Sequence, residues 1–194
     1  MEENRKYNII YADPPWQYRV WKKKEAGRTA QSHYPTMDIP ALSSLPISNL
    51  AAPDCALFLW VTFPLLFESY QLLQTWGFEY KTVAFVWVKL NRKSDSLFWG
   101  MGHWTRANAE FCLLATRGNP KRQSARVHQI ILSHIQEHSR KPAETRDRIV
   151  QLMGDLPRIE LFARESVPGW DVWGNEAPGS ISLEPYQNLS KERK

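Results

Sequence analysis

The stretch that most limits how this chain can fold lies near its amino terminus, where an apolar segment stops at a carboxylate and two prolines. Residues 8–11 are typical of a short buried strand, and the residues that follow are Ala12, Asp13, Pro14, Pro15 and Trp16. Because proline cannot donate a ladder hydrogen bond, the strand must end near Asp13. Open α/β sheets bind ligands at this carboxyl edge. We therefore expect Asp13, an unpaired Pro14 carbonyl and the face of Trp16 to line a pocket for a planar molecule with an amino group.

Length and composition predict one folded unit. The chain has 194 residues, of which 43% are hydrophobic, so it can bury one sizeable core. We expect a single domain over residues 1–178 and a polar, flexible tail over residues 179–194. The amino terminus shows no signal peptide, and no apolar run reaches the length of a membrane span, which favours a cytoplasmic protein without a membrane partner.

The two cysteines and the histidines predict neither disulfides nor a metal site. Cys55 and Cys112 each lie in an apolar context, which is typical of reduced core thiols. His134 and His138 are four residues apart with His128 nearby, but no carboxylate or third ligand follows at the tight spacing that zinc sites use. We therefore predict no metal.

Basic residues gather in three groups, each after a predicted strand. The net charge is +5, and the groups are Lys22, Lys23, Lys24 and Arg28, then Lys89, Arg92 and Lys93, then Lys121, Arg122 and Arg126. Solvated loops often carry such charges, but three groups favour a nucleic-acid partner.

Alternating apolar patterns predict an α/β fold. Continuous apolar runs predict strands over residues 56–62 and 78–89, and the helical stripe of residues 65–76 lies between them. This β-α-β unit predicts a mostly parallel central sheet with helices on both faces. Further strands are expected over residues 110–116, 129–133, 158–162 and 170–173, a short helix within residues 35–50, and a longer helix over residues 142–153.

Two loops between these elements have the composition of a nucleic-acid contact. Residues 17–34 lack any sustained period and read as a lid, in which Trp21 is followed by Lys22 and Lys23. An aromatic residue beside cations can hold a nucleotide strand by stacking and phosphate contact. The first loop also contains the aromatic residue Tyr18, and the second loop, residues 91–108, offers His103, Trp104 and Arg106.

Taken one at a time, the polar motifs have ordinary explanations. The opening motif could be a simple strand-to-turn junction, and Glu160 could be a salt-bridge partner. In order along residues 7–176, however, the motifs together resemble the MT-A70 family of S-adenosylmethionine-dependent methyltransferases, which act on the exocyclic amine of adenine. The pieces that carry the resemblance are Asp13 to Trp16, Phe58 to Thr62, Trp76 to Phe78, Trp87 to Lys89, Gly102 to Trp104, Glu110 to Gly118, His138 to Pro142, Glu160 to Arg164 and Gly174 to Glu176.

The resemblance implies a Rossmann-like methyltransferase in which the catalytic motif precedes the cofactor motif. Asp13, Pro14, Pro15 and Trp16 would be the catalytic residues. The cofactor S-adenosylmethionine would contact the chain through Glu160, which accepts from the ribose hydroxyls, and through Lys141, Leu161, Phe162, Arg164, Asn175 and Glu176.

The reaction that follows is methylation of the N6 amine of adenine. That amine is a poor nucleophile, and Asp13 with the Pro14 carbonyl could accept its two hydrogens and aim its lone pair at the methyl group. The compact length favours DNA as the substrate. RNA methylation, cytosine N4 methylation and a catalytically silent nucleic-acid-binding subunit remain alternatives, and the chain could be a monomer or a homodimer.

Overall fold

Seven strands form one sheet in the computed structural model, which describes residues 5–17, 36–102, 104–137, 140–179, 181 and 183. The lid expected over residues 17–34 lies, apart from its first residue, outside this described part. The strands are β1 (Tyr7–Ala12), β2 (Ala51–Val61), β3 (Glu79–Leu90), β4 (Ala109–Arg117), β5 (Ile130–His134), β6 (Arg158–Leu161) and β7 (Asp171–Trp173). The α-helices are α1 (Ile39–Ser43), α2 (Leu66–Thr75) and α3 (Glu144–Met153), and the 3-10 helices are η3 (Ile47–Asn49) and η4 (Phe63–Leu65).

The sheet is mixed, with the order β5-β3-β4-β2-β1-β6-β7. The pairs β1·β2, β1·β6, β6·β7 and β3·β5 are parallel, whereas β4 runs antiparallel to both of its neighbours. The sequence predicted a mostly parallel sheet, and the antiparallel β4 corrects that prediction. β2, α2 and β3 do follow one another as predicted, but β4 lies between the two strands, and a continuous apolar run does not reveal which way a buried strand points.

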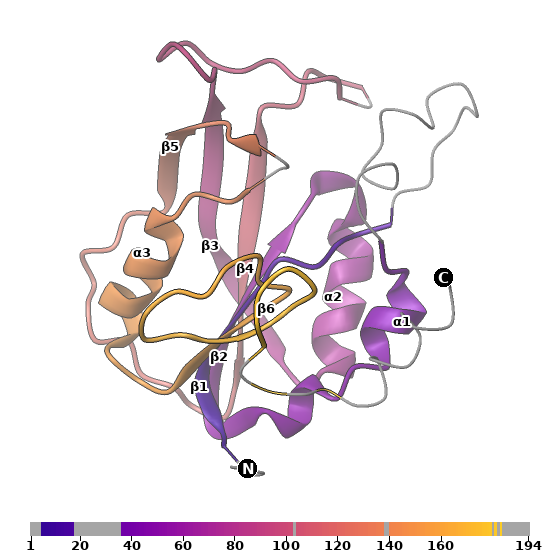
Figure 1. Cartoon of the computed structure of the whole chain (residues 1–194), viewed down its shortest axis with the longest axis vertical. Helices are drawn as coiled ribbons and strands as arrows, with labels where there is room; N and C mark the ends of the chain where they lie inside the picture. Colours follow the sequence, from indigo (N-terminus) through magenta and orange to yellow (C-terminus); the bar gives the residue numbers. More distant parts are fainter. Residues whose placement is uncertain are drawn as a thin grey trace.

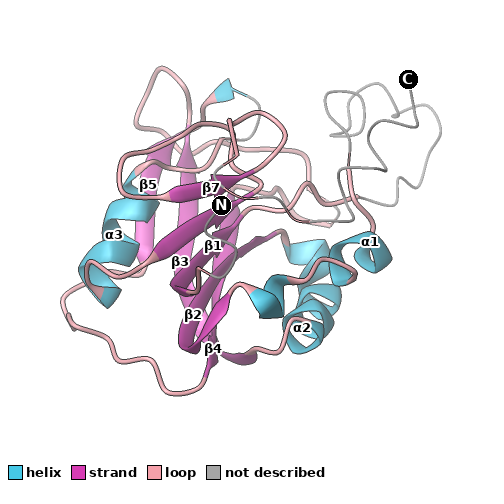
Figure 2. Ribbon diagram, turned by 60° about the horizontal axis from the view of Figure 1, so that its bottom comes forward, coloured by secondary structure: helices cyan, strands magenta, loops and turns pink. Residues whose placement is uncertain are grey.

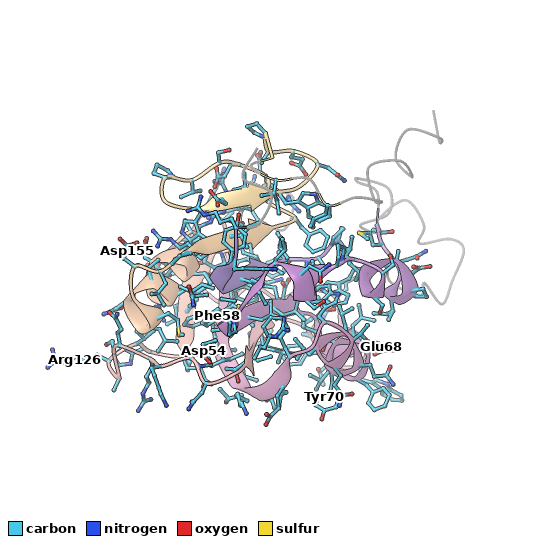
Figure 3. The ribbon with its side chains drawn as sticks, turned by 90° about the horizontal axis from the view of Figure 1, so that it is seen from below. Asp54, Phe58, Glu68, Tyr70, Arg126 and Asp155 are labelled. Carbon is cyan, nitrogen blue, oxygen red and sulfur yellow. The ribbon has the colours of Figure 1, made fainter. Side chains whose placement is uncertain are left out.

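Helices cover both faces of the sheet (Figures 1 and 2). On one face, α1 and α2 place Leu42, Leu72 and Leu73 in a core cluster with side chains of β1 and β2. On the other face, α3 places Ile149 and Met153 in a second cluster that includes Phe58 of β2, which lies at the centre of Figure 3. Residues 55–61 of β2 are buried on both faces, as the apolar run over residues 56–62 predicted.

Local signals explain where the helices begin and end. Asp38 is the N-cap of α1, and its carboxylate accepts a hydrogen bond from the Ala41 amide at 2.9 Å. α3 ends at Gly154, whose φ of +93° suits a residue without a side chain. Among the described residues, no helix is long and apolar enough to cross a membrane.

The topology creates a crevice beside β1. From this strand, the sheet continues through β2 on one side and through β6 on the other. β1, β2 and β6 are parallel, so their carboxyl ends lie at the same edge. Open α/β sheets bind ligands at the carboxyl ends of neighbouring strands whose connections lead to opposite sides of the sheet. Asp13 follows β1 at this point.

Candidate active site

A tight turn holds the segment that follows β1. The Trp16 amide donates to the Pro14 carbonyl at 2.8 Å, and the Met37 amide donates to the Pro15 carbonyl at 2.8 Å. The expectation of an unpaired Pro14 carbonyl is therefore wrong. Proline lacks an amide proton, but its carbonyl can still accept a hydrogen bond from the amide two residues later in the chain. A carbonyl oxygen has two lone pairs, so Pro14 keeps one for a ligand.

Trp16 supports this turn from within the protein. Its side chain is only 5% exposed, and its indole Nε1 donates to the Trp60 carbonyl at 3.0 Å. Trp60 in turn donates from its own Nε1 to the Tyr11 hydroxyl at 2.7 Å. The role of Trp16 as a stacking surface stays a prediction, while its hydrogen bond fixes the turn to the end of β2.

A line of alternating charges runs from Asp13 into the β3–β4 pair. The Lys141 ammonium lies 2.8 Å from Asp13 Oδ1 and 2.9 Å from Asp13 Oδ2. The same ammonium lies 3.3 Å from Glu110 Oε2, and Glu110 Oε1 accepts from Lys89 at 2.5 Å. Lys141 also lies 5.8 Å from the centre of the Trp60 ring, within the range of a cation–π contact. All four charges are therefore held by partners rather than by solvent.

Burial and charge pull the pKa values of these groups in different directions. Burial raises the pKa of Asp13, and the positive charge of Lys141 offsets part of that rise. Burial alone would also raise the pKa of Glu110, but Lys141 and Lys89 bring it below its usual value. Burial lowers the pKa of Lys141, yet its two carboxylate neighbours outweigh this, so the net pKa is raised and the lysine stays protonated.

Glu160 has a bidentate partner on the facing helix. Arg146 of α3 donates from Nε to Glu160 Oε2 at 2.6 Å and from Nη2 to Glu160 Oε1 at 2.9 Å. Glu160 pairs with Tyr11 in the β1–β6 register, which brings it to the same face as Asp13, two residues beyond Tyr11. Burial raises the pKa of Glu160 and Arg146 opposes this rise.

Backbone strain marks the residue that follows β6. Phe162 has a φ of +61°, and it is the one non-glycine residue with a positive φ in the described part of the chain. Strained positions of this kind cluster at ligand sites. The turn places the Phe162 ring 5.2 Å from the Trp173 ring and lets the Ala163 amide donate to the Trp173 carbonyl at 3.0 Å. A side chain at Gly174 would lie 2.2 Å from the Ala163 carbonyl oxygen, so this contact requires glycine.

These groups line one small cleft at the carboxyl ends of β1 and β6. Its volume is about 30 Å³, and its lining residues are Tyr11, Asp13, Arg140, Lys141, Arg146, Glu160, Phe162, Arg164 and Glu165. The cleft thus brings together Asp13, Lys141, Glu160, Phe162 and Arg164 from the sequence prediction. Three carboxylates and four cations in one cleft suit a ligand that carries hydroxyl, amine and carboxylate groups.

The other predicted residues are not among those that line the cleft. The Leu161 side chain is fully buried in the core, and Asn175 and Glu176 are exposed beside Gly174. Trp104 and Arg106 are exposed in the β3–β4 connection. Tyr18, Trp21, Lys22, Lys23 and His103 lie outside the described residues. Their roles stay predictions.

One basic group lies far from the cleft. Arg117, the last residue of β4, pairs with Cys55 near the amino end of β2, so the chain leaves β4 at the edge opposite Asp13. Lys121, Arg122 and Arg126 follow there and are exposed. Figure 3 shows Arg126 at the margin of the molecule. The antiparallel direction of β4 separates this group from the site.

Sequence reasoning missed Glu110, Lys89 and Arg146 as site residues. Glu110 and Lys89 meet because β4 is antiparallel to β3, with Trp87 opposite Glu110, and this pairing is not visible in the sequence. A carboxylate on a buried strand is seldom without a cationic partner, so Glu160 did signal that an arginine or lysine lies nearby. It did not signal that Arg146 is the one.

Comparison with known proteins yields a family match and several relatives. The MT-A70 family model matches residues 7–176. A Type II methyltransferase of a Mycoplasma species, M.MunI, is 37% identical, and the match covers 98% of this chain and 86% of the relative. An MT-A70-like N(6)-adenosine-methyltransferase of Arabidopsis thaliana is 29% identical over 89% of this chain, and an N6-methyladenosine RNA methyltransferase of Pyricularia oryzae is 31% identical over 88%. The chain spans only 24% and 46% of the lengths of these last two relatives.

Proposed function

The chain belongs to the MT-A70 family, and on that premise we propose that it transfers a methyl group from S-adenosylmethionine to the N6 amine of adenine in DNA. The observation that carries the proposal is the cleft in which Asp13, Lys141 and Glu160 meet. S-adenosylmethionine is the methyl donor of this family. The crevice beside β1, with helices on both faces of the sheet, supports a Rossmann-like methyltransferase fold whose catalytic motif precedes its cofactor motif.

The polar groups of the cleft fit this methyl donor. A strand-end carboxylate such as Glu160 can accept hydrogen bonds from ribose hydroxyls, and each of its oxygens keeps a second lone pair beside the bond to Arg146. Lys141 and Arg164 would face the carboxylate of the methionine part, with Asn175 and Glu176 completing the pocket after Gly174.

Asp13 and Pro14 would orient the base. Bound in the cleft, S-adenosylmethionine supplies an electrophilic methyl group. An ionised Asp13 carboxylate offers about four lone-pair sites, of which Lys141 uses one on each oxygen, so it can still accept one amine hydrogen while the Pro14 carbonyl accepts the other. These two bonds draw the amine out of the plane of the ring and direct its lone pair at the methyl group.

Electrostatics keeps this arrangement ready for reaction. Lys141 stays protonated between two carboxylates, so it favours the ionised form of Asp13 that the amine requires. Trp16 fixes the turn through its bond to the Trp60 carbonyl. The acceptors are thus oriented before the substrate arrives, and the reaction needs no covalent intermediate with the enzyme.

One observation supports DNA rather than RNA as the carrier of the adenine. The net charge of +5 suits a polyanion of either kind. The Mycoplasma relative, a Type II methyltransferase, is matched over 86% of its length, whereas the relative named as an RNA methyltransferase is matched over 46%. The chain therefore resembles the former as a nearly whole protein and the latter only as one part.

The test is methyl transfer from labelled S-adenosylmethionine to DNA and RNA oligonucleotides of the same sequence. We expect label in DNA, recovered as N6-methyladenine after digestion to nucleosides. Label only in RNA would overturn the substrate, and N4-methylcytosine would overturn the target base. Calorimetry measures whether the protein binds S-adenosylmethionine in the absence of nucleic acid. A catalytically silent subunit would bind DNA but would show no binding of the methyl donor.

A further inference from the structure

Large apolar side chains are exposed along the connection between β3 and β4, beginning with Leu97 at 38%. Trp99 is 60% exposed, Met101 is 75% exposed and Trp104 is 95% exposed. Single apolar residues on a surface are ordinary, but a group of large ones marks a binding surface. The outermost described residues of this connection, 101, 102 and 104–106, are named the tip. Nothing in the methyl-transfer geometry uses it.

The tip is a tightly closed turn. At its base, the Gly100 amide donates to the Ala107 carbonyl at 2.8 Å, and the two residues form an antiparallel bridge. A Cβ atom at Gly102 would lie 1.7 Å from the Thr105 carbonyl oxygen, so only glycine permits this approach. The backbone therefore presents Met101 and Trp104 on a defined turn, which is how an inserting element must hold its side chains.

The tip lies at the same edge of the sheet as the candidate active site. β1 and β2 are parallel, and β4 is antiparallel to both β2 and β3, so the carboxyl ends of β1 and β3 point the same way. Figure 1 shows the β3–β4 connection extending beyond the carboxyl end of β3 at the top of the molecule. Lys89 and Glu110 lie where this connection leaves the sheet, and their ion pairs lead through Lys141 to Asp13.

The charge of the whole β3–β4 connection suits a phosphate backbone. The connection of residues 91–108 contains Arg92, Lys93 and Arg106 against a single carboxylate, Asp95. Arg106 is exposed two residues after Trp104. Cations beside an exposed aromatic ring are the combination with which proteins hold a nucleic-acid strand and stack on its bases.

We propose that the tip is a wedge that enters the DNA duplex beside the target adenine, with Trp104 stacking in the space that the adenine leaves. The inference rests on the proposed function, because an adenine amine inside a duplex cannot reach Asp13 unless the base is flipped out. Flipping costs the stacking and pairing energy of the target base. A tryptophan ring that stacks on the bases on either side of the gap offsets part of that cost.

The test compares paired and unpaired targets. The probe is a short DNA duplex carrying a sequence that the wild-type chain methylates, mapped on plasmid DNA from cells that express it. In one version the target adenine faces thymine, and in the other it faces an abasic site. For Trp104→Ala we expect turnover to fall about 10- to 100-fold on the paired target and by less than about threefold on the unpaired one. Trp104→Phe keeps an aromatic ring and should retain much of the paired activity.

A second readout does not depend on methyl transfer. The target adenine is replaced by 2-aminopurine, whose fluorescence rises when the base leaves the stack, and each protein is added at saturation judged by anisotropy. We expect the rise with the wild type and its loss with Trp104→Ala. Tyr80→Ala is the matched control, because it removes a 38% exposed aromatic ring at the opposite end of β3 and should leave both readouts unchanged.

The outcomes separate the wedge from the proposed function. Suppose that the wild type methylates DNA. If Trp104→Ala then loses the same share of its activity on the paired and the unpaired target, or loses activity on neither target, the wedge is overturned and the proposed function stands. If the wild type self-associates in gel filtration and Trp104→Ala abolishes only that association, the tip is an interface between copies, and the wedge is likewise overturned. If the wild type methylates no DNA at all, paired or unpaired, the function itself fails and the wedge fails with it.

Discussion

The Lys141 ammonium holds the Asp13 carboxylate at both oxygens, at 2.8 and 2.9 Å, although 128 positions separate the two residues in the chain. Asp13 follows the first strand, whereas Lys141 precedes α3. Their contact joins the part of the cleft that would orient the base to the part that would hold the methyl donor. The charge state of Asp13 therefore depends on residues from the far end of the sequence.

Replacing Asp13 should separate catalysis from binding. Asp13→Ala removes the acceptor for the amine hydrogens, and Asp13→Asn leaves a group that offers a single acceptor oxygen. By comparison with the loss of one oriented hydrogen-bonding group in other active sites, we expect the turnover number to fall about 100- to 1000-fold. DNA affinity, measured by anisotropy, should change little.

Neither variant should unfold the chain, because Lys141 keeps Glu110 as a partner when Asp13 is lost. Thermal unfolding checks this point. Near-normal turnover in Asp13→Ala would show that the amine is oriented by other groups.

Glu110→Gln should shift the pH dependence of the reaction. Burial raises the pKa of Asp13, and the negative charge of Glu110 adds to that rise. Removing this charge lowers the pKa of Asp13, so the carboxylate stays ionised at lower pH. Because only the ionised form accepts both the lysine and the amine, we expect the acidic limb of kcat/KM to move to lower pH.

A second acid-to-amide change provides the comparison for Glu110→Gln. Asp95 lies in the connection between β3 and β4, and its side chain is 94% exposed. Asp95→Asn should leave the acidic limb where it is in the wild type. A limb that moves to higher pH in Glu110→Gln, or does not move, would contradict the assignment of that limb to Asp13.

How much of the site can be read from the sequence depends on whether a residue is marked by its immediate neighbours. Asp13 follows an apolar strand and precedes two prolines, Lys141 precedes the first turn of a helix, and Glu160 interrupts an apolar strand. Each local pattern places its residue at the end of an element or within a core. The structure brings all three into one cleft.

What the sequence does not reveal is pairing across the sheet. The direction of β4 decides that Lys89 meets Glu110 and that Arg126 lies far from the cleft. An apolar strand buried on both faces looks the same in either direction. Similarly, the bidentate contact of Arg146 with Glu160 depends on how α3 lies across β6, and helical periodicity shows only which face of a helix is apolar.

Arg146→Met should destabilise the fold in a pH-dependent way. It leaves the Glu160 carboxylate buried without its bidentate partner, and breaking a buried pair typically costs about 3–5 kcal/mol. Burial already raises the pKa of Glu160, and losing Arg146 raises it further. A carboxyl whose pKa is higher in the folded chain destabilises it above that pKa, and the penalty disappears below the unfolded value of about 4.3. Urea unfolding should therefore show a large deficit at neutral pH that shrinks in acid.

The control for Arg146→Met is an arginine at the surface. Arg126 is exposed at the margin of the molecule (Figure 3). Arg126→Met should change the free energy of unfolding by less than about 0.5 kcal/mol at either pH. If the Arg146→Met deficit were the same in acid as at neutral pH, the loss would come from packing rather than from the charge of Glu160.

The last prediction concerns the lid expected over residues 17–34, whose lysines should contact DNA. A matched charge reversal elsewhere in the chain provides the control. Changing Lys22, Lys23 and Lys24 together to glutamate should weaken DNA binding and flatten its dependence on salt, because each lost phosphate contact removes about 0.9 from the slope of log affinity against log salt. Reversing Lys121, Arg122 and Arg126 instead alters the net charge by the same amount at the edge opposite Asp13. We expect this second variant to keep most of the wild-type slope, measured by anisotropy over a salt series. Equal losses in both variants would mean that DNA responds only to the overall charge of the protein.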